Sequence, residues 1–269
     1  MTEPHRLSET PDGRVVGLDG CAGGWFAVWS DADRQGIESE LYEDLSDVFA
    51  DHREADRLLA DIPIGLESST SRECDLLARR RLGIRGVSVF PAPCRRVVDY
   101  RQRDGDEVTY NRANEIQREN LDSGISQQAW NITDKIAAMD TYLRGESSAD
   151  ESPAVDVYES HPECCFAALN DGYPIAHSKS SQTGRAARFA VLDEAVSGWQ
   201  SCYEAACEDY YFNQVARDDI IDAIVLCAAG RQPLESMPEE PPEDNGLPMQ
   251  IVVPKTEPAW VQYLLLAEQ

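Results

Sequence analysis

The sequence has few lysines, no long apolar run and no clustered cysteines, and each shortage excludes a class of protein. Lysine occurs at three positions, Lys135, Lys179 and Lys255, and the other basic residues are arginines. No apolar stretch approaches the roughly 20 residues that cross a membrane, and residues 1–13 lack the apolar segment of a secretory signal. The eight cysteines form no CxxC pair and no zinc-binding spacing. These absences predict a cytoplasmic protein that does not bind membranes, with most cysteines buried as small apolar residues.

The charge of the chain is strongly negative. Acidic residues number 49 against 24 basic ones, which gives a net charge of -25 and an isoelectric point near 4.4. Enrichment in acid with depletion of lysine is typical of the cytoplasm of salt-loving organisms. At molar salt the Debye length is only about 3 Å, so repulsion between the carboxylates is screened. We therefore predict a halophilic protein whose acidic residues lie mostly on a solvated surface.

The order of apolar patterns predicts an α/β fold with a mixed five-stranded sheet flanked by helices, interrupted by helical insertions. Residues 1–13 are expected to form a flexible tail, residues 14–269 a single domain, and residues 232–248 a surface loop rich in proline and acid. The expected strands are 15–19, 25–30, 37–42, 58–62 and 152–160, with a late edge strand at 249–254. The expected helices are 45–54, 69–83, 111–121, 126–143, 162–169, 183–196 and 213–229. The chain thus begins with three strands joined as hairpins, followed by helix, strand, helices, strand and helix. This is the element order of an RNase H-like fold.

Some carboxylates lie within apolar segments, where a charge is costly unless it is paired or bound to metal. Asp19 and Asp61 end two predicted strands, Glu159 ends another, and Asp219 and Asp222 share one face of an apolar helix. Carboxylates that converge in this way favour Mg²⁺ or Mn²⁺. Two such ions can activate a water molecule and stabilise the leaving oxygen of a phosphodiester. We interpret Asp19, Asp61, Asp219 and Asp222 as metal ligands and Glu159 as a further catalytic residue.

Each of these acids also has a purely structural interpretation. Asp61 can cap the turn that precedes Pro63, and Asp218 or Asp219 can cap a helix. Glu159 can pair with an arginine. The metal-site interpretation rests on the joint placement of the acids at element ends.

Basic residues near these acids are candidates for binding substrate. Eight arginines and a single acid lie in the segment 79–103, and Arg95 and Arg96 at its centre are candidates for a phosphate-binding patch. Pairing of these arginines with surface acids is the alternative. Lys179 is one of the few retained lysines and can contact phosphate or a ligand carboxylate near Glu159, or it can be an ordinary surface lysine. His161 can contact substrate, bind metal or transfer a proton, or it can simply hydrogen-bond its neighbours.

Several longer motifs resemble a known family. They read "GLDGCAGGW", "DIPIGL", "CDLLARRRLG…SVFPAP", "NRANEIQREN", "SQQAWNITDKIAAMD", "ESHPECCFAALN", "HSKSSQTGRAAR" and "DDIIDA". Together they are similar to the predicted RNase H-like nuclease family called domain of unknown function 429, over roughly residues 14–231. The resemblance implies an RNase H-like fold and a nuclease activity. The spacing Asp219-x-x-Asp222-Ala is similar to the acidic helix of Holliday-junction resolvases, which implies that Asp19, Asp61 and Asp222 are metal ligands.

The sequence thus predicts a Mg²⁺- or Mn²⁺-dependent nuclease that hydrolyses phosphodiester bonds in DNA or RNA. Two alternatives remain open. One is an actin-like phosphotransferase, which shares the fold and an aspartate on the first strand but normally needs two such domains. The other is a non-catalytic protein that has kept the fold and binds a ligand or a partner. Metal-dependent cleavage separates the nuclease from both alternatives.

Overall fold

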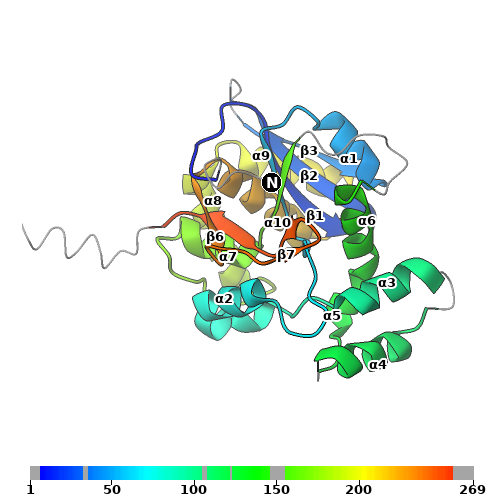
Figure 1. Ribbon diagram of the computed structural model, residues 1–269. Helices are drawn as coiled ribbons and strands as arrows, with labels where there is room; N and C mark the ends of the chain where they lie inside the picture. Colours follow the sequence, from blue (N-terminus) through cyan, green and yellow to red (C-terminus); the bar gives the residue numbers. More distant parts are fainter. Residues whose placement is uncertain (1–6, 33–35, 105–107, 122, 146–154, 257–269) are drawn as a thin grey trace, which may run out of the picture.

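The central feature of the computed structural model, which describes residues 7–32, 36–104, 108–121, 123–145 and 155–256, is a twisted five-stranded sheet. The strands lie in the order β3-β2-β1-β4-β5 (Figure 1). Strand β2 is antiparallel to both of its neighbours, whereas β1, β4 and β5 are parallel. The bounds are β1 Val15–Cys21, β2 Gly24–Ser30, β3 Glu38–Tyr42, β4 Arg57–Ala60 and β5 Asp156–Glu159. The predicted α/β fold with a mixed five-stranded sheet is confirmed.

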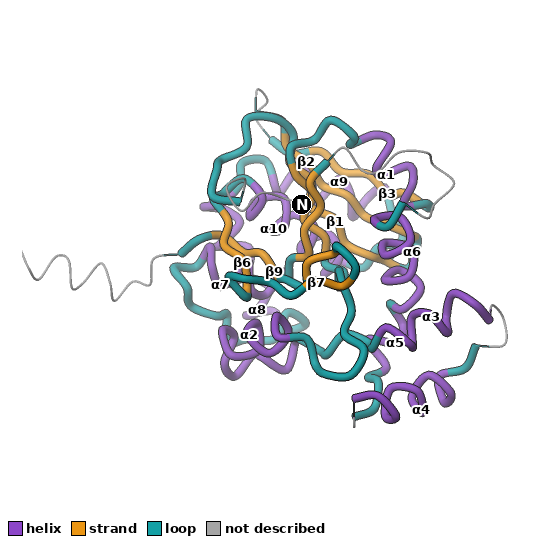
Figure 2. Tube along the Cα trace, in the orientation of Figure 1, coloured by secondary structure: helices purple, strands orange, loops and turns teal. Residues whose placement is uncertain are grey.

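Helices cover both faces of this sheet (Figure 2). One core lies between the sheet and α7–α10 and contains Phe26, Leu59 and Phe166. The second lies between the opposite face and α1 and α6 and contains Leu18 and Phe49. The bounds are α1 Leu45–Asp51, α2 Glu73–Leu82, η2 Gly83–Ser88, α3 Arg95–Asp104, α4 Tyr110–Leu121, α5 Gln127–Asn131, α6 Thr133–Leu143, α7 Pro162–Leu169, α8 Gln182–Ala195, α9 Trp199–Asp209 and α10 Arg217–Gly230. Because β1 and β4 are covered on both faces, their buried stretches, residues 15–18 and 58–60, are apolar at successive positions rather than alternating.

Strand β1 and helix α10 approach each other unusually closely. A Cβ atom added at Gly17 would lie 2.2 Å from the carbonyl oxygen of Ala223 and 2.4 Å from the amide nitrogen of Cys227. The backbone of α10 therefore packs directly on the backbone of β1, which only glycine permits at this position. This contact fixes the position of α10 relative to the carboxyl end of β1.

The first hairpin also depends on a glycine. Cys21 pairs with Gly24 across a two-residue turn. Gly24 has a φ of +134°, and a Cβ at this position would lie 2.0 Å from the carbonyl oxygen of Tyr42. The hairpin predicted for the first two strands is confirmed, and its turn at residues 22–23 brings β2 back beside β1 soon after Asp19.

Helices α3, α4 and α5 project from the body of the molecule (Figure 1). A cluster of alternating charges ties this helical insertion to the rest of the chain. Arg95 donates to both carboxylate oxygens of Asp140, at 2.6 and 2.8 Å, and also pairs with Asp244. Arg144 donates to Asp140 at 3.0 Å and to Asp244 at 2.8 Å. Two arginines and two aspartates thus link α3, α6 and the segment after α10 through ion pairs that are largely shielded from water.

The segment 232–248, which we expected to be a loop, contains short strands. Strand β6 (Leu234–Met237) pairs with β9 (Ile251–Pro254) in a separate two-stranded sheet, and β7 (Glu243–Asp244) pairs with β8 (Leu247–Pro248). The late strand at 249–254 is therefore not an edge of the main sheet. These strands have four residues or fewer, and tertiary pairing rather than an alternating pattern defines them.

Some boundaries at the N-terminus and in the helices differ from the prediction. Residues 7–13 are held by backbone contacts, including a 2.6 Å hydrogen bond from the Leu234 amide to the Leu7 carbonyl, and residues 1–6 of the expected tail lie outside the described residues. The single helix expected over 126–143 is divided at Ile132 into α5 and α6. Helices α3 and α9 were not predicted. The described part of the chain contains no helix that is long and apolar enough to cross a membrane.

Candidate metal centre

Three aspartates from distant parts of the sequence converge at the carboxyl end of the central strands. Asp19 lies near the end of β1, Asp61 directly follows β4, and Asp222 lies on α10. One carboxylate oxygen from each lies within 4.8 Å of those of the other two. The predicted convergence of these residues is confirmed, and the cluster can hold a metal ion.

Local structure explains why the three side chains meet. Strands β1 and β4 are parallel neighbours, and the Asp61 amide continues their ladder by donating to the Leu18 carbonyl at 3.0 Å. Asp61 therefore lies beside Asp19 on the adjacent strand. The close packing of α10 on Gly17 brings Asp222 over the same point. Asp222 is the charged residue in an otherwise apolar buried stretch of α10, so its side chain is directed at the other acids rather than at solvent.

Two members of the triad are buried, and Asp61 is partly exposed. Asp19 is 7% exposed and Asp222 is 4% exposed. Burial, together with the charges of Asp61 and Asp222, raises the pKa of Asp19 well above its usual value. Burial raises the pKa of Asp61 to about 7 and that of Asp222 to about 6. Within the described residues, no group donates a hydrogen bond to the carboxylate of Asp19 or Asp61. A site of three carboxylates with so little compensation fits a divalent cation, which supplies the missing positive charge.

Lys179 is the one described cation that pairs with the triad. It lies in the loop between α7 and α8, and its Nζ donates to Asp222 at 2.7 Å and lies 3.2 Å from Asp218. Although burial lowers the pKa of Lys179, the attraction of Asp222 raises it further, so the side chain is charged. The prediction that Lys179 lies near the acidic site agrees with this placement, and its partner is Asp222 rather than Glu159.

The triad opens into a cavity of about 360 Å³, which we call the triad cavity. Its walls include Arg85 from η2, Phe90 from the following loop, and His161 at the start of α7. The Nε atom of Arg85 and the Nδ1 atom of His161 are buried in the described structure without a hydrogen-bond partner. Burial lowers the pKa of His161, so its imidazole is neutral at pH 7. Two polar atoms without partners thus belong to side chains that line the same cavity as the acids, which is the arrangement expected for binding a polar ligand.

Glu159 and Asp219, which we predicted as site residues, have structural partners instead. Glu159 accepts a 2.5 Å hydrogen bond from Arg72 and a 2.7 Å hydrogen bond from the Ile64 amide. It also lines the triad cavity, but both of its oxygens are engaged. Asp219 accepts from the Ala216 amide at 3.0 Å and so caps the start of α10. Neither belongs to the metal-competent cluster. These contacts match the structural alternatives that the sequence left open, which were pairing with an arginine for Glu159 and capping of a helix for Asp219.

A second buried ion pair supports the wall of the cavity. Glu163 accepts hydrogen bonds from Arg188 through both oxygens, at 2.5 and 2.7 Å, and Arg188 is 1% exposed. Arg188 also donates to the Gly184 carbonyl at 2.8 Å. This pair connects α7 to α8 and holds the loop that carries Lys179.

The arginine-rich segment 79–103 does not form one phosphate-binding patch. Arg79 donates to the Val89 carbonyl, and Arg81 pairs with Glu235. Arg95 forms ion pairs with Asp140 and Asp244. Arg101 pairs with Asp134. Arg96 is exposed and lines a separate hollow between α3 and α4. The substrate-binding role expected for Arg95 and Arg96 is therefore not supported by their positions, because neither residue lines the triad cavity.

Sequence reasoning missed Arg85, which alone among the described arginines of segment 79–103 lines the triad cavity. Periodicity could not separate it from its neighbours, because it lies in a short 3-10 helix. It also missed the ion pairs of Arg72 and Arg188, which no sequence pattern indicates. Gly17 carried a usable signal, since a glycine inside a buried strand marks a close backbone approach.

One comparison with known proteins identifies a family. The model of a family described as "Protein of unknown function (DUF429)" matches residues 17–243, which include Asp19, Asp61 and Asp222. No curated protein and no solved structure matches the chain significantly.

Proposed function

The chain belongs to the DUF429 family, as its motifs predicted, and we propose that it is a divalent-metal-dependent phosphodiesterase that acts on nucleic acid. The observation that carries this proposal is the convergence of Asp19, Asp61 and Asp222 within 4.8 Å, on two central strands and one buried helix. The element order and the mixed sheet support an RNase H-like fold. The net charge of -25 with three lysines supports a halophilic origin.

Mg²⁺ or Mn²⁺ is the cofactor that fits these ligands. The cluster offers only carboxylate oxygens, with no thiolate or imidazole among its three members, and hard cations prefer such donors. When bound, the metal supplies Lewis-acid activation of water and stabilisation of charge on the phosphate. Asp19, Asp61 and Asp222 would hold it, and ionisation of all three is favoured only when it is present.

The chain's own residues would bind and orient the phosphodiester. Arg85 lines the triad cavity and can donate to a non-bridging phosphate oxygen through its unpartnered Nε. The neutral His161 can accept a hydrogen bond from substrate at Nδ1. Apolar groups on the same wall, including Phe90, limit the access of bulk water. Lys179 keeps Asp222 oriented and partly neutralises the triad.

Replacement of one ligand tests this function. We expect purified protein in molar KCl with Mn²⁺ or Mg²⁺ to cleave single-stranded or structured DNA or RNA. Asp19→Asn should abolish cleavage and retain nucleic-acid binding, because asparagine keeps the shape but not the charge that holds the metal. Asp47→Asn is the matched control, since Asp47 is an exposed acid on α1 on the far side of the sheet. Its cleavage rate should equal that of the unmodified protein.

The two alternatives correspond to distinct results in the same experiment. Hydrolysis of ATP that is lost in Asp19→Asn, without cleavage of any nucleic acid, would indicate an actin-like phosphotransferase. The absence of both activities, with Asp19→Asn indistinguishable from the unmodified protein, would indicate a non-catalytic binding protein.

A further inference from the structure

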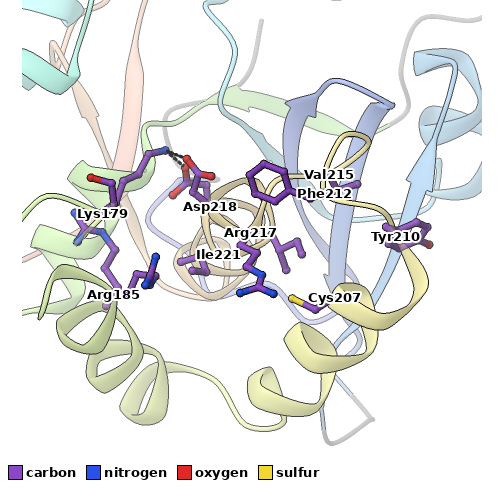
Figure 3. Close-up of a pocket in the computed structure, with 13 residues that line it drawn as sticks. Lys179, Arg185, Cys207, Tyr210, Phe212, Val215, Arg217, Asp218 and Ile221 are labelled. Atoms are coloured by element: carbon purple, nitrogen blue, oxygen red, sulfur yellow. Dashed lines mark hydrogen bonds and ion pairs between the residues drawn. The ribbon is translucent and has the colours of Figure 1, made fainter. Parts of the chain in front are cut away.

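A second cavity adjoins the metal centre. It has a volume of about 510 Å³ and lies between α8, the end of α9 and the first turns of α10 (Figure 3). Lys179 and Asp222 line both this cavity and the triad cavity, so the two hollows share one wall. We call it the Arg217 cavity. A ligand that occupies the metal centre can extend across Lys179 into this second space.

Two arginines that line the Arg217 cavity have unengaged guanidinium groups. Arg185 lies on the first turns of α8 and Arg217 at the start of α10. Neither forms a side-chain hydrogen bond or an ion pair with any residue in the described ranges. Elsewhere in this strongly acidic chain, arginines such as Arg72, Arg95 and Arg188 are engaged by carboxylates. Figure 3 shows Lys179 and Arg185 along one side of the cavity, with Arg217 between Arg185 and Cys207.

The same cavity has an aromatic and apolar wall. Phe212 is 72% exposed although it is a large apolar side chain, and it lines the cavity together with Tyr210. Val215, Ile220 and Ile221 contribute further apolar surface. An exposed aromatic ring beside guanidinium groups is the combination with which proteins bind single-stranded nucleic acid, the ring by stacking on a base and the cations by contact with phosphate.

We propose that the Arg217 cavity binds the nucleotide next to the scissile phosphate, and that the substrate is a single strand passing from the triad cavity over Lys179. The proposal rests on the proposed phosphodiesterase function. Arg185 and Arg217 bind the phosphate of the neighbouring nucleotide, and its base stacks on Phe212. A base can reach the ring only when it is unpaired, so an intact duplex is a poorer substrate than a single strand.

Two substrates of different size test this inference. Bis(4-nitrophenyl) phosphate carries one phosphodiester and occupies only the triad cavity, whereas a fluorescently labelled 12-nucleotide oligo-dT spans both cavities. The variants are Arg185→Glu/Arg217→Glu and Phe212→Ala. The control is Arg80→Glu/Arg118→Glu, which makes the same charge change at two exposed arginines of α2 and α4 that line neither cavity. All of the substituted side chains are exposed, so unchanged melting temperatures are expected.

We expect each test variant to lower kcat/KM for the oligonucleotide by about tenfold or more, which corresponds to the loss of one stacking or phosphate contact. Hydrolysis of the small diester should stay within about twofold of the unmodified protein, and the control should match the unmodified protein on both substrates. Equal losses on the two substrates, or no loss on the oligonucleotide, would overturn the second-cavity proposal while the phosphodiesterase function stands.

A binding measurement separates the failure of the two proposals. If the unmodified protein hydrolyses neither substrate, the phosphodiesterase function fails. Fluorescence anisotropy of the same oligonucleotide in Ca²⁺ then shows whether Arg185→Glu/Arg217→Glu weakens binding relative to the control. Weakening by about tenfold supports the cavity as a strand-binding site, and equal affinity overturns it.

Discussion

The triad should destabilise the metal-free protein, and Asp61→Asn measures by how much. Burial, with the charges of Asp219 and Glu163, raises the pKa of Asp61 to about 7 from 3.8, against the opposing effect of Lys179. A shift of one unit corresponds to about 1.4 kcal/mol, so ionised Asp61 costs the folded state up to about 4 kcal/mol. Because Asp61 is partly exposed, we expect Asp61→Asn to stabilise the metal-free protein by about 2 kcal/mol at pH 8.

The sign of the pH dependence follows from the raised pKa. Between about pH 4 and 7, the folded carboxyl retains a proton that the unfolded chain has already released. Stability in EDTA should therefore fall as the pH rises through this window and should level off above it. Asp61→Asn should flatten this decline. Saturating Mn²⁺ should reverse it, because metal binding requires ionised carboxylates and strengthens as they lose protons.

Urea unfolding in molar KCl at pH 5 and pH 8 provides the measurement, with EDTA in one series and Mn²⁺ in the other. Asp47→Asn is the control for the loss of one exposed negative charge. In Mn²⁺ the order should invert, with the unmodified protein more stable than Asp61→Asn. If Asp61→Asn is no more stable than the unmodified protein in EDTA at pH 8, then repulsion in the triad is not a cost of folding and the reasoning is wrong.

Two further predictions concern packing and salt. Gly17→Ala should destabilise the protein by about 3 kcal/mol and weaken Mn²⁺ binding in isothermal titration, because the new Cβ forces α10 away from β1. Gly20→Ala is the control, since its Cβ would meet side chains rather than backbone, namely the flexible Lys135 at 2.4 Å and Ile62 Cδ1 at an ordinary contact distance of 3.4 Å. Equal losses in both variants would contradict this explanation. With a net charge of -25, the melting temperature should rise through a KCl series from 0.1 to about 2 M as repulsion is screened, and a constant value would argue against a halophilic protein.

The central sheet and the triad were predictable because their signals are local. Strands β1 and β4 are short apolar runs covered on both faces, and each carries or precedes an aspartate that an ordinary core would exclude. Asp222 stands out in the same way within an apolar helix. A charge placed where burial is costly indicates function without any knowledge of tertiary structure.

The partners of the other charged residues were not predictable in this way. Arg85 and Arg95 lie ten residues apart in one basic segment, yet one lines the triad cavity and the other is bound by Asp140 and Asp244. The sequence shows that both are cationic but not which direction each side chain takes. Likewise, β6 and β9 are defined by pairing with each other across a turn-rich segment, and strands of four residues are too short to show a period.

The cluster of Arg95, Asp140, Arg144 and Asp244 constrains how this chain can evolve. Each aspartate is shared by both arginines, so losing any one member leaves three shielded charges of which one is uncompensated, a change that costs several kcal/mol. Exchanging all four for apolar residues of similar volume carries no such penalty. Among relatives, these positions should therefore be retained together or replaced together. The joint substitution pattern of these four sites would then record how the helical insertion became attached to the body of the molecule that carries the aspartate triad.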